Sequence, residues 1–428
     1  MKVLVIGGGG REHAIAWKTA QSPLVTSIHA TSPGAGMDEV AVDIGCSASD
    51  VDAIVSFATS AHVGLVIVGP EAPLVAGVAD ALREAGVPVV GPGAAAARLE
   101  GSKAWAKEIM IRSGVPTAGH RTFTEMAEAL AYAAEQVHPI VVKASGLAAG
   151  KGVVIAMTPA ESTAAIREMM EERRFGNAGA CVVIEECLVG EEVSLIALCS
   201  GTTAIPLASS QDHKRLLEGD RGPNTGGMGA YSPAPALDDG AMAAAMDQVI
   251  TPILETLASD GIGFQGFLYA GLMMTADGPK VLEYNVRLGD PETQAILPRF
   301  QGDWIPLLLD VANGESLEGR ELHWDDRAAV CVVMAAEGYP RSPRKGDAIV
   351  GLQEAVSEDC VVFHAGTRRE GGAIRTGGGR VLGVTAWGPN HVEAVARAYR
   401  GVDAISFPGM QFRRDIAARA LKRSEPTA

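Results

Sequence analysis

The sequence predicts a multidomain protein of mixed α/β and α+β class, for three reasons. A chain of 428 residues is too long for a single hydrophobic core and suggests about three domains. Residues 1–93 alternate short apolar runs with helical patterns, which is typical of a doubly wound parallel sheet. After residues 325–326, valine-rich runs and clustered glycines instead indicate a small antiparallel sheet.

The N-terminal domain is expected to be a parallel sheet wound with helices. Its strands are expected at residues 3–6, 27–30, 65–68 and 87–90, and its helices at residues 11–21 and 51–60. Ligands of such sheets bind at the carboxyl ends of the strands. Here those ends carry glycines, at residues 7–10, 69–71 and 91–93.

A joint rich in proline, glycine and alanine is expected at residues 91–97, followed by a basic helix at residues 102–113. The later expected elements are short strands and one helix (158–174) around a glycine loop at 143–152, a long loop at 211–235, a helix at 240–258, a hairpin around 377–379 and a helix at 391–400.

The composition limits the class of function. With 36 basic and 51 acidic residues, the formal net charge of −15 argues against nucleic-acid or anionic-membrane binding. The six cysteines are scattered without a CxxC pair, so we expect reduced, buried thiols rather than zinc. The first apolar run is too short for a signal peptide, and no run is long enough to span a membrane. A soluble, cytoplasmic protein is expected.

Residues 283–287 carry the strongest chemical signal. On a strand, Glu283 and Asn285 would share one face, where their oxygens suit Mg²⁺. Arg287 follows at the same spacing, and its planar fork matches a carboxylate or phosphate. A metal site beside an anion clamp is what phosphoryl transfer requires. A salt-bridged strand end remains the alternative.

The N-terminal glycines do not complete a dinucleotide-binding motif. Glu12 stands at the third glycine position of G-x-G-x-x-G, and the second strand ends in residues 30–32 without an acid for an NAD ribose. The backbone at residues 7–10 is still suited to a phosphate or phosphosugar at a helix start, or else forms only a tight turn. His13 could take part, although a lone helical histidine is more often structural.

Two further loops are candidates for ligand binding. Residues 143–152 join a strand-end lysine to a glycine loop with a second lysine, as a polyphosphate site needs; the spacing is not that of a Walker A loop, and a mobile surface hairpin is the alternative. Residues 211–231 hold a polar, glycine-rich loop, for which we favour substrate binding over a linker. The acidic pair at 185–186 could serve an adenine edge and a ribose, although solvated charges explain it better when it is taken alone, and the same holds for the pair at 191–192.

Together these stretches resemble the ATP-grasp ligases over essentially the whole chain. The most specific marks are Arg-Leu-Gly-Asp-Pro-Glu at 287–292, Gln-Asp-His-Lys-Arg at 211–215, Gly-Pro-Asn-Thr-Gly-Gly-Met-Gly-Ala-Tyr at 222–231, Gly-Gly-Gly-Gly-Arg-Glu-His-Ala at 7–14 and Gly-Pro-Glu-Ala-Pro-Leu at 69–74. The resemblance implies an N-terminal substrate domain (1–101), an ATP-grasp domain (102–326) with a lid subdomain (117–190), and a C-terminal α+β domain (327–428).

The resemblance also implies an activity. ATP, with Mg²⁺ or Mn²⁺, would drive the ligation of glycine to 5-phosphoribosylamine through glycyl phosphate, giving glycinamide ribonucleotide in an early step of purine synthesis. The partners would be these small molecules, without nucleic acid or membrane, and the protein is expected to be a monomer or a weak dimer. Catalysis would rest on positioning, charge neutralisation and exclusion of water.

Residue roles follow from the resemblance. The residues expected to bind ATP are Lys103, Lys143, Gly146, Gly150, Lys151, Gly152, Glu185, Glu186, Leu188 and, for the ribose, Glu191. The expected metal ligands are Glu283 and Asn285. The residues expected to act in catalysis are Arg287, Asp290 and Asp212. The residues expected to bind substrate are Gly8, Gly9, Gly10, Arg11, Glu12, Glu71, Asp212, Lys214, Gly227 and Arg287.

The chain departs from the family pattern at three places. Ser145 replaces an acid in the phosphate loop, Leu288 replaces a phenylalanine, and residues 270–274 offer no carboxylate for a second metal ion. The alternative functions are a carboxylate–amine ligase with other substrates, a nicotinamide oxidoreductase and a non-catalytic nucleotide sensor. Glu12 argues against the oxidoreductase, and the run at 283–290 argues against the sensor.

Overall fold

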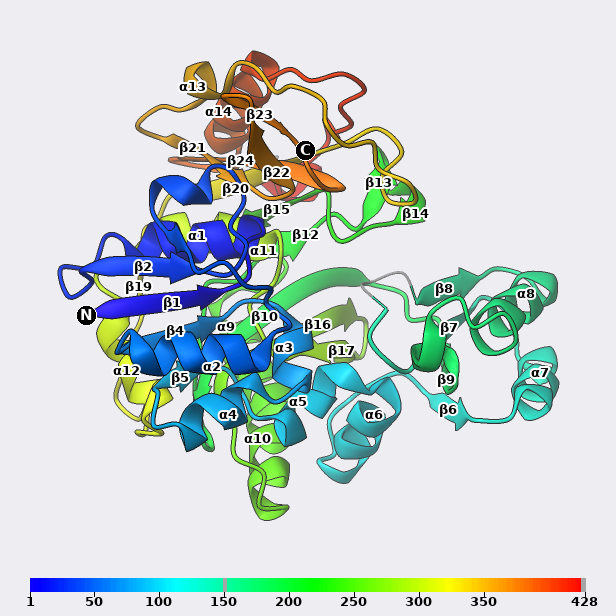
Figure 1. Cartoon of the computed structure of the whole chain (residues 1–428). Coiled ribbons are helices and arrows are strands. Elements are labelled where there is room, and N and C mark those ends of the chain that lie inside the picture. Colours follow the sequence, from blue (N-terminus) through cyan, green and yellow to red (C-terminus); the bar gives the residue numbers. More distant parts are fainter. Residues whose placement is uncertain (149–151, 425–428) are drawn as a thin grey trace.

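The N-terminal part forms the expected parallel sheet, with strand order β3-β2-β1-β4-β5, in a computed structural model that describes residues 1–148 and 152–424 (Figure 1). Residues 3–6 and 65–68 are buried throughout, as parallel strands covered by helices on both faces must be. The strands are β1 (Lys2–Ile6), β2 (Ser27–Ala30), β3 (Val42–Asp43), β4 (Leu65–Val68) and β5 (Val89–Val90), and the helices are α1 (Gly10–Thr19), α2 (Val51–Ser60), α3 (Glu71–Val75) and α4 (Val78–Glu84).

The prediction of an irregular joint at residues 91–97 is wrong for residues 94–97. Helix α5 (Ala94–Gly101) begins there, because four consecutive alanines have the highest helix propensity. The basic helix is confirmed as α6 (Lys103–Arg112), whose N-cap Ser102 accepts a hydrogen bond from the Trp105 amide. Side chains of α5 and α6 share one hydrophobic core with β1, β4 and the central sheet, so the N-terminal and central parts are packed together.

The lid subdomain projects from the body of the molecule (Figure 1, right). It is a four-stranded sheet of order β6-β9-β7-β8 with a hydrophobic core of its own. Its elements are β6 (His120–Phe123), α7 (Met126–Glu135), β7 (Ile140–Ala144), β8 (Val153–Ala156), α8 (Pro159–Met170) and β9 (Val182–Glu186). The sequence predicted one helix here, and α7 is the one it missed.

The central sheet is antiparallel, with order β11-β10-β16-β17. Its strands are β10 (Glu191–Ser200), β11 (Thr203–Pro206), β16 (Gln265–Thr275) and β17 (Gly278–Asn285). The helix predicted at 240–258 is present as α9 (Asp239–Ala245), one π-helical turn (Met246–Ile250) and α10 (Thr251–Ser259). The short elements that follow are α11 (Glu292–Ile296), β18 (Phe300–Gln301), α12 (Ile305–Ala312) and β19 (His323–Trp324).

The C-terminal sheet, of order β12-β15-β20-β24-β21, takes two strands from the loop predicted at residues 211–235. β12 (Gln211–Asp212) and β15 (Gly229–Ser232) pair with each other, and β15 pairs with β20 (Ala328–Ala335). Between them, β13 (Arg215–Leu217) and β14 (Arg221–Asn224) form a hairpin. The other elements are α13 (Leu352–Ala355), β21 (Cys360–His364), β22 (Thr367–Glu370), β23 (Ala373–Thr376), β24 (Arg380–Gly388), α14 (His391–Ala404) and α15 (Ala418–Ser424).

The hairpin predicted around residues 377–379 is wrong. β22 pairs with β23 instead, so the turn lies at Gly371 and Gly372, both of which have positive φ. Residues 377–379 connect β23 to β24, which lies between β20 and β21 in the large sheet. The helix predicted at 391–400 is confirmed as α14. Within the described ranges, no helix is long and apolar enough to cross a membrane.

Candidate active site

One cavity of about 550 Å³ is lined by side chains from every large part of the fold. The N-terminal part contributes Arg11 and Glu71, the lid contributes Lys143, the central sheet contributes Glu283, and the C-terminal sheet contributes Arg380. These residues lie far apart in the sequence, so the cavity exists only when all the parts are assembled. It has the size expected of a site for small ligands.

Strand β17 places two oxygen donors on the cavity face. Glu283, Tyr284 and Asn285 all line the cavity, and the buried Tyr284 hydroxyl donates a hydrogen bond to the Val249 carbonyl (2.7 Å). Burial alone would raise the pKa of Glu283, but the nearby cations, Lys214 foremost, hold it below its usual value. The Glu283 carboxylate is therefore ionised at neutral pH.

This pair fits a magnesium ion that is only partly held by protein. A carboxylate and an amide oxygen are ligands that Mg²⁺ prefers, and Mg²⁺ commonly completes its shell with water and phosphate oxygens. Across residues 1–148 and 152–424, no group of three or more histidine, cysteine, aspartate and glutamate side chains could hold a metal ion by itself. The donor set thus suits a cation that arrives with a phosphate ligand.

Lysines form the cationic side of the cavity. The Lys143 ammonium pairs with Glu185 (2.8 Å) and donates to the Leu282 carbonyl (2.9 Å). The Lys103 ammonium lies 3.4 Å from the Gly146 carbonyl oxygen, and Lys103 N donates to the Ser145 carbonyl (2.8 Å). Both lysines line the cavity, so their charges are available to an anion bound there.

The phosphate loop is described only in part, because Gly150 and Lys151 lie outside the described residues. Gly146 packs closely on the backbone of Ala178, and a Cβ there would come within 2.6 Å of the Ala178 Cα. Gly152 lines the cavity. The Ser145 hydroxyl accepts a hydrogen bond from the Ala104 amide (3.1 Å), so this departure from the family pattern helps to cap α6.

Glu185 lines the cavity, but its carboxylate is paired rather than free. Its carboxylate bridges Lys107 (3.1 Å) and Lys143 (2.8 Å), and all three side chains are almost fully buried. Burial lowers the pKa of Lys107 to about 8. The next residues along the strand end, Glu186 and Leu188, line the cavity beside Lys143.

The structure does not support the expectation for Glu191. Glu191 pairs with Arg423 and accepts from the Gln211 side-chain amide (3.1 Å), and it is not part of the cavity wall in the described chain. Its neighbour Glu192 lines the cavity and pairs with Lys214. Successive strand residues face opposite sides, so only one of two adjacent acids can reach the ligand.

Arg287 is held rigidly at the cavity wall. Its Nη2 donates to the Glu100 carboxylate (2.7 Å) and to Asn285 Oδ1 (3.2 Å), and its Nη1 donates to the Leu288 carbonyl (3.2 Å). Glu71 lies 3.4 Å from its Nε. Burial alone would lower the pKa of Arg287, but Glu100 and Glu71 raise it, so Arg287 remains a fixed cation.

The two aspartates expected to act in catalysis have different surroundings. Asp290 accepts from the Gln294 amide (2.7 Å) and pairs with Arg380 (3.0 Å), and together these partners fix its carboxylate. Asp212 is buried and lines the cavity, yet its carboxylate makes no hydrogen bond or ion pair with any described residue. Burial raises the pKa of Asp212. An unpartnered buried carboxylate is suited to accept a cationic ligand group.

The N-terminal glycines are used mainly by the protein itself. Gly9 N donates to the Glu12 carboxylate (2.8 Å), which also accepts from Arg11 Nε (2.6 Å), so Glu12 caps α1. A Cβ on Gly8 would lie 2.1 Å from the Ser32 carbonyl oxygen. Of the substrate residues expected in this part, Arg11 and Glu71 line the cavity, whereas Gly8, Gly9, Gly10 and Glu12 are not among its lining residues.

His13 and Gly227 do not line the cavity either. His13 accepts a hydrogen bond from the His364 amide (2.9 Å), and burial lowers its pKa to about 3, so it is a neutral contact between α1 and β21. Gly227 has a φ of +110°, and a Cβ there would meet Pro291 at 2.4 Å. Its neighbour Gly226 is the residue that lines the cavity.

Comparisons with known proteins agree over the whole chain. The models of the phosphoribosylglycinamide synthetase N domain, ATP-grasp (A) domain and C domain match residues 1–100, 101–293 and 329–419. A phosphoribosylamine–glycine ligase of Allochromatium vinosum is 52% identical over 427 residues, with 99% of each chain covered. One of Vibrio parahaemolyticus is 50% identical over 428 residues, covering 99% of this chain and 100% of its own. The chain belongs to the phosphoribosylglycinamide synthetase family.

Solved structures place this synthetase-family chain among the ATP-grasp ligases. The crystal structure of phosphoribosylamine–glycine ligase from Thermotoga maritima is 32% identical with a TM-score of 0.84, covering 97% of this chain and 100% of that one. A biotin carboxylase domain from Hydrogenobacter thermophilus, in complex with MgADP, is 20% identical with a TM-score of 0.73 over 96% of this chain and 91% of that one, and shows the shared fold. The predicted three-part fold class is thereby confirmed.

The synthetase cavity also contains residues that sequence reasoning missed. They are Glu100, Lys107, Glu292 and Arg380, together with Glu192, which was named only as part of an acidic pair and given no role of its own. Glu292 closes the Arg-Leu-Gly-Asp-Pro-Glu run and Glu192 adjoins Glu191, so both lay beside recognised signals. No motif marked the other three.

Proposed function

We propose that this chain ligates glycine to 5-phosphoribosylamine, with ATP converted to ADP and phosphate and glycyl phosphate as the intermediate. Membership of the synthetase family supports the reaction, and so do the names of its full-length relatives. The structural observation that carries the proposal is a single cavity. In it, two lysines, the Glu283–Asn285 oxygen pair, the rigid cation Arg287 and the unpartnered Asp212 carboxylate converge.

The lid side of the cavity is proposed to hold ATP. Lys103 and Lys143 would neutralise the phosphates, and Leu147, Ala148 and Gly152 would lie along them. Glu186 and Leu188 would flank the adenine, and Glu192 would receive the ribose hydroxyls in place of Glu191. Lys143 is fixed by Glu185 and by the Leu282 carbonyl, so it is preorganised for an anion.

Glu283 and Asn285 are proposed to bind Mg²⁺ or Mn²⁺, which when bound would neutralise phosphate charge and orient the transferred group. Arg287 lies two residues further along and faces the same cavity. It would stabilise charge on the transferred phosphoryl group or on the glycine carboxylate. Because Glu100 and Glu71 hold its guanidinium, this charge would need little rearrangement during the reaction.

The proposed chemistry has two steps. A glycine carboxylate oxygen attacks the γ-phosphorus, and the bond from that phosphorus to ADP breaks. The amine nitrogen of phosphoribosylamine then attacks the glycyl carbonyl carbon, phosphate leaves, and the nitrogen loses a proton. Asp212 is proposed to bind an ammonium group, while Arg11 and Glu71 on the N-terminal side are proposed to meet the phosphosugar.

A coupled assay of ADP release tests the proposal. ADP should form only when glycine and freshly prepared phosphoribosylamine are both present, and glycinamide ribonucleotide should accumulate in equal amount. ADP release that ignores the amine, or that accepts another carboxylic acid equally well, would contradict it.

A further inference from the structure

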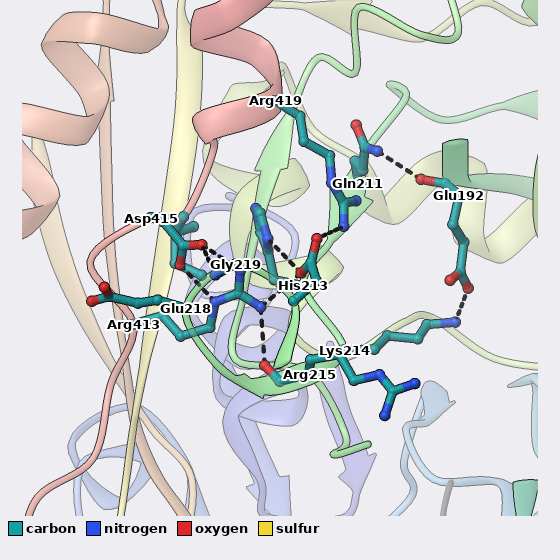
Figure 2. A network of polar contacts seen from close by, with 12 residues as sticks. Glu192, Gln211, His213, Lys214, Arg215, Glu218, Gly219, Arg413, Asp415 and Arg419 are labelled. Carbon is teal, nitrogen blue, oxygen red and sulfur yellow. Dashed lines mark hydrogen bonds and ion pairs between the residues drawn. The ribbon is translucent and has the colours of Figure 1, made fainter. Parts of the chain in front are cut away.

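The last described part of the chain contacts the β13–β14 hairpin (Figure 2). We call residues 411–419 the C-terminal arm. Three hydrogen bonds from backbone amides to side chains join the arm to the hairpin region. Gly219 N donates to the Asp415 carboxylate (2.8 Å), Arg414 N donates to the Glu218 carboxylate (3.1 Å), and Ala417 N donates to His213 Nε2 (3.0 Å). The arm therefore covers one side of the segment from residue 213 to residue 220.

Arg413 is the centre of this contact. Its side chain is 1% exposed, and it donates on two sides at once. Nε and Nη2 donate to the two oxygens of Asp415 (2.7 Å each). Nη1 donates to Asp220 (2.9 Å) and to the Arg215 carbonyl (3.0 Å). The planar fork of arginine is needed to make these bonds together.

The turn that Arg413 holds is a strained one. Asp220 has a φ of +53°, which a side chain disfavours, and a turn of this kind persists only where its surroundings hold it. Arg419 supplies a second partner to Asp220 (2.6 Å). The hairpin conformation therefore depends on the arm.

The strand alternation connects this contact to the active site. Asp212 and Lys214 line the cavity, whereas His213 between them faces the arm and accepts from Ala417 N. The Lys214 carbonyl accepts from Thr225 N (2.8 Å), and Arg413 holds the carbonyl of the following residue. The arm thus fixes the back of a short segment whose front faces the proposed reactants.

We propose that Arg413 is a positioning residue for the ligase reaction, acting through residues 213–215 to keep Asp212 and Lys214 directed into the cavity. Arg413 itself does not line the cavity within the described part of the chain. The proposal rests on the proposed function, because it assigns Asp212 and Lys214 to that reaction.

The test uses the full chain with Arg413→Lys, which keeps the charge but cannot form the fork. Displacing a reacting group by about 1 Å can cost roughly a hundred-fold in rate. We therefore expect kcat to fall by about ten-fold to a hundred-fold, with the KM for ATP within about two-fold of wild type. The matched control is Arg414→Lys, because the Arg414 side chain is exposed and pairs with Asp403 (2.6 Å), away from the hairpin.

Two further measurements separate positioning from a general loss of stability. Combining Arg413→Lys with Lys214→Met should reduce kcat by less than the product of the two single effects, because part of the Arg413 effect acts through Lys214. Full additivity would overturn the proposal. If Arg413→Lys does not fold, Asp220→Asn can replace it, because this change removes the charged hairpin partner of Arg413. It should likewise lower kcat and leave the KM for ATP nearly unchanged.

Amide hydrogen exchange makes the test independent of the assay. Exchange at Gly219 and at its neighbours in residues 213–219 should become at least about ten-fold faster in Arg413→Lys than in Arg414→Lys. Unchanged exchange would overturn the positioning proposal whatever the activity. If the wild-type protein releases no ADP with glycine and phosphoribosylamine, the proposed function fails, and the exchange result still decides whether Arg413 holds this segment.

Discussion

Replacing Arg287 by methionine should separate the catalytic role of this residue from its role in folding. Glu100 is 8% exposed, and its carboxylate accepts two hydrogen bonds, from Arg287 Nη2 (2.7 Å) and from Val286 N (2.8 Å). Arg287→Met removes one charge-assisted bond and leaves Glu100 with a single backbone donor. Breaking one side of a buried ion pair costs about 3–5 kcal/mol of stability, because a charge is left unpaired.

The cost should depend on pH in a defined direction. Burial raises the pKa of Glu100 in the folded protein, and Arg287 opposes that rise. Without Arg287 the folded pKa rises further above the unfolded value, about 4.3. Stability is then fully present below that unfolded pKa and is lost as pH rises toward the folded pKa, by about 1.4 kcal/mol per pH unit. The variant should therefore lose more stability at pH 8 than at pH 5.

The double variant Arg287→Met/Glu100→Gln provides the control. Glutamine keeps an acceptor for Val286 N without the charge, so most of the lost stability should return. The assays are urea unfolding at pH 5 and pH 8 and coupled ADP release. The double variant should unfold near the wild-type midpoint but remain about a hundred-fold or more slower in ADP release. Wild-type turnover in this well-folded variant would refute the role of Arg287.

Glu283→Gln should raise the Mg²⁺ concentration needed for half-maximal ADP release, and an identical metal titration would remove Glu283 as a ligand. Glu192→Gln should raise the KM for ATP about ten-fold, whereas Glu191→Gln should leave it within about two-fold; equal effects would contradict the cavity geometry. The pKa of Lys107 in the folded protein is about 8, below its unfolded value of about 10.4. Folding therefore carries the full cost of burying the Lys107 charge below pH 8, and this cost disappears as the pH rises toward 10.4. Wild-type protein should accordingly gain stability relative to Lys107→Met between those pH values, as measured by urea unfolding, and a flat difference would count against this.

The sequence was sufficient where local pattern determines structure. The buried strands and glycine-ended turns of the N-terminal sheet lie as predicted, and Glu283 and Asn285, which alternation predicted to share a face, both line the cavity. Strand alternation could not decide which of Glu191 and Glu192 faces the cavity, because two adjacent acids always point to opposite faces and either one could be the inner one. The glycines at 377–379 predicted a hairpin there, whereas the hairpin turn lies at Gly371 and Gly372.

The remaining site residues could not be predicted because tertiary contacts define them. Glu100 reaches Arg287 across 187 positions, and Arg380 reaches the Asp290 carbonyl across 90 (2.7 Å). Neither residue stands in a run that suggests chemistry. The sequence also could not predict that Lys107 is buried beside Glu185, because it indicated only that the helix carrying Lys107 is basic.

The C-terminal sheet combines strands from two separate stretches of the sequence, and this limits where the chain can be cut or exchanged with that of a relative. β15 (Gly229–Ser232) lies between β12 and β20, so its backbone groups are satisfied by partners from both sides of residue 326. A fragment starting after that position would carry an open, apolar strand edge, and the fragment left behind would carry another. Exchange of the last hundred or so residues with those of a relative should therefore yield soluble chimaeras only when residues 211–232 are transferred with them.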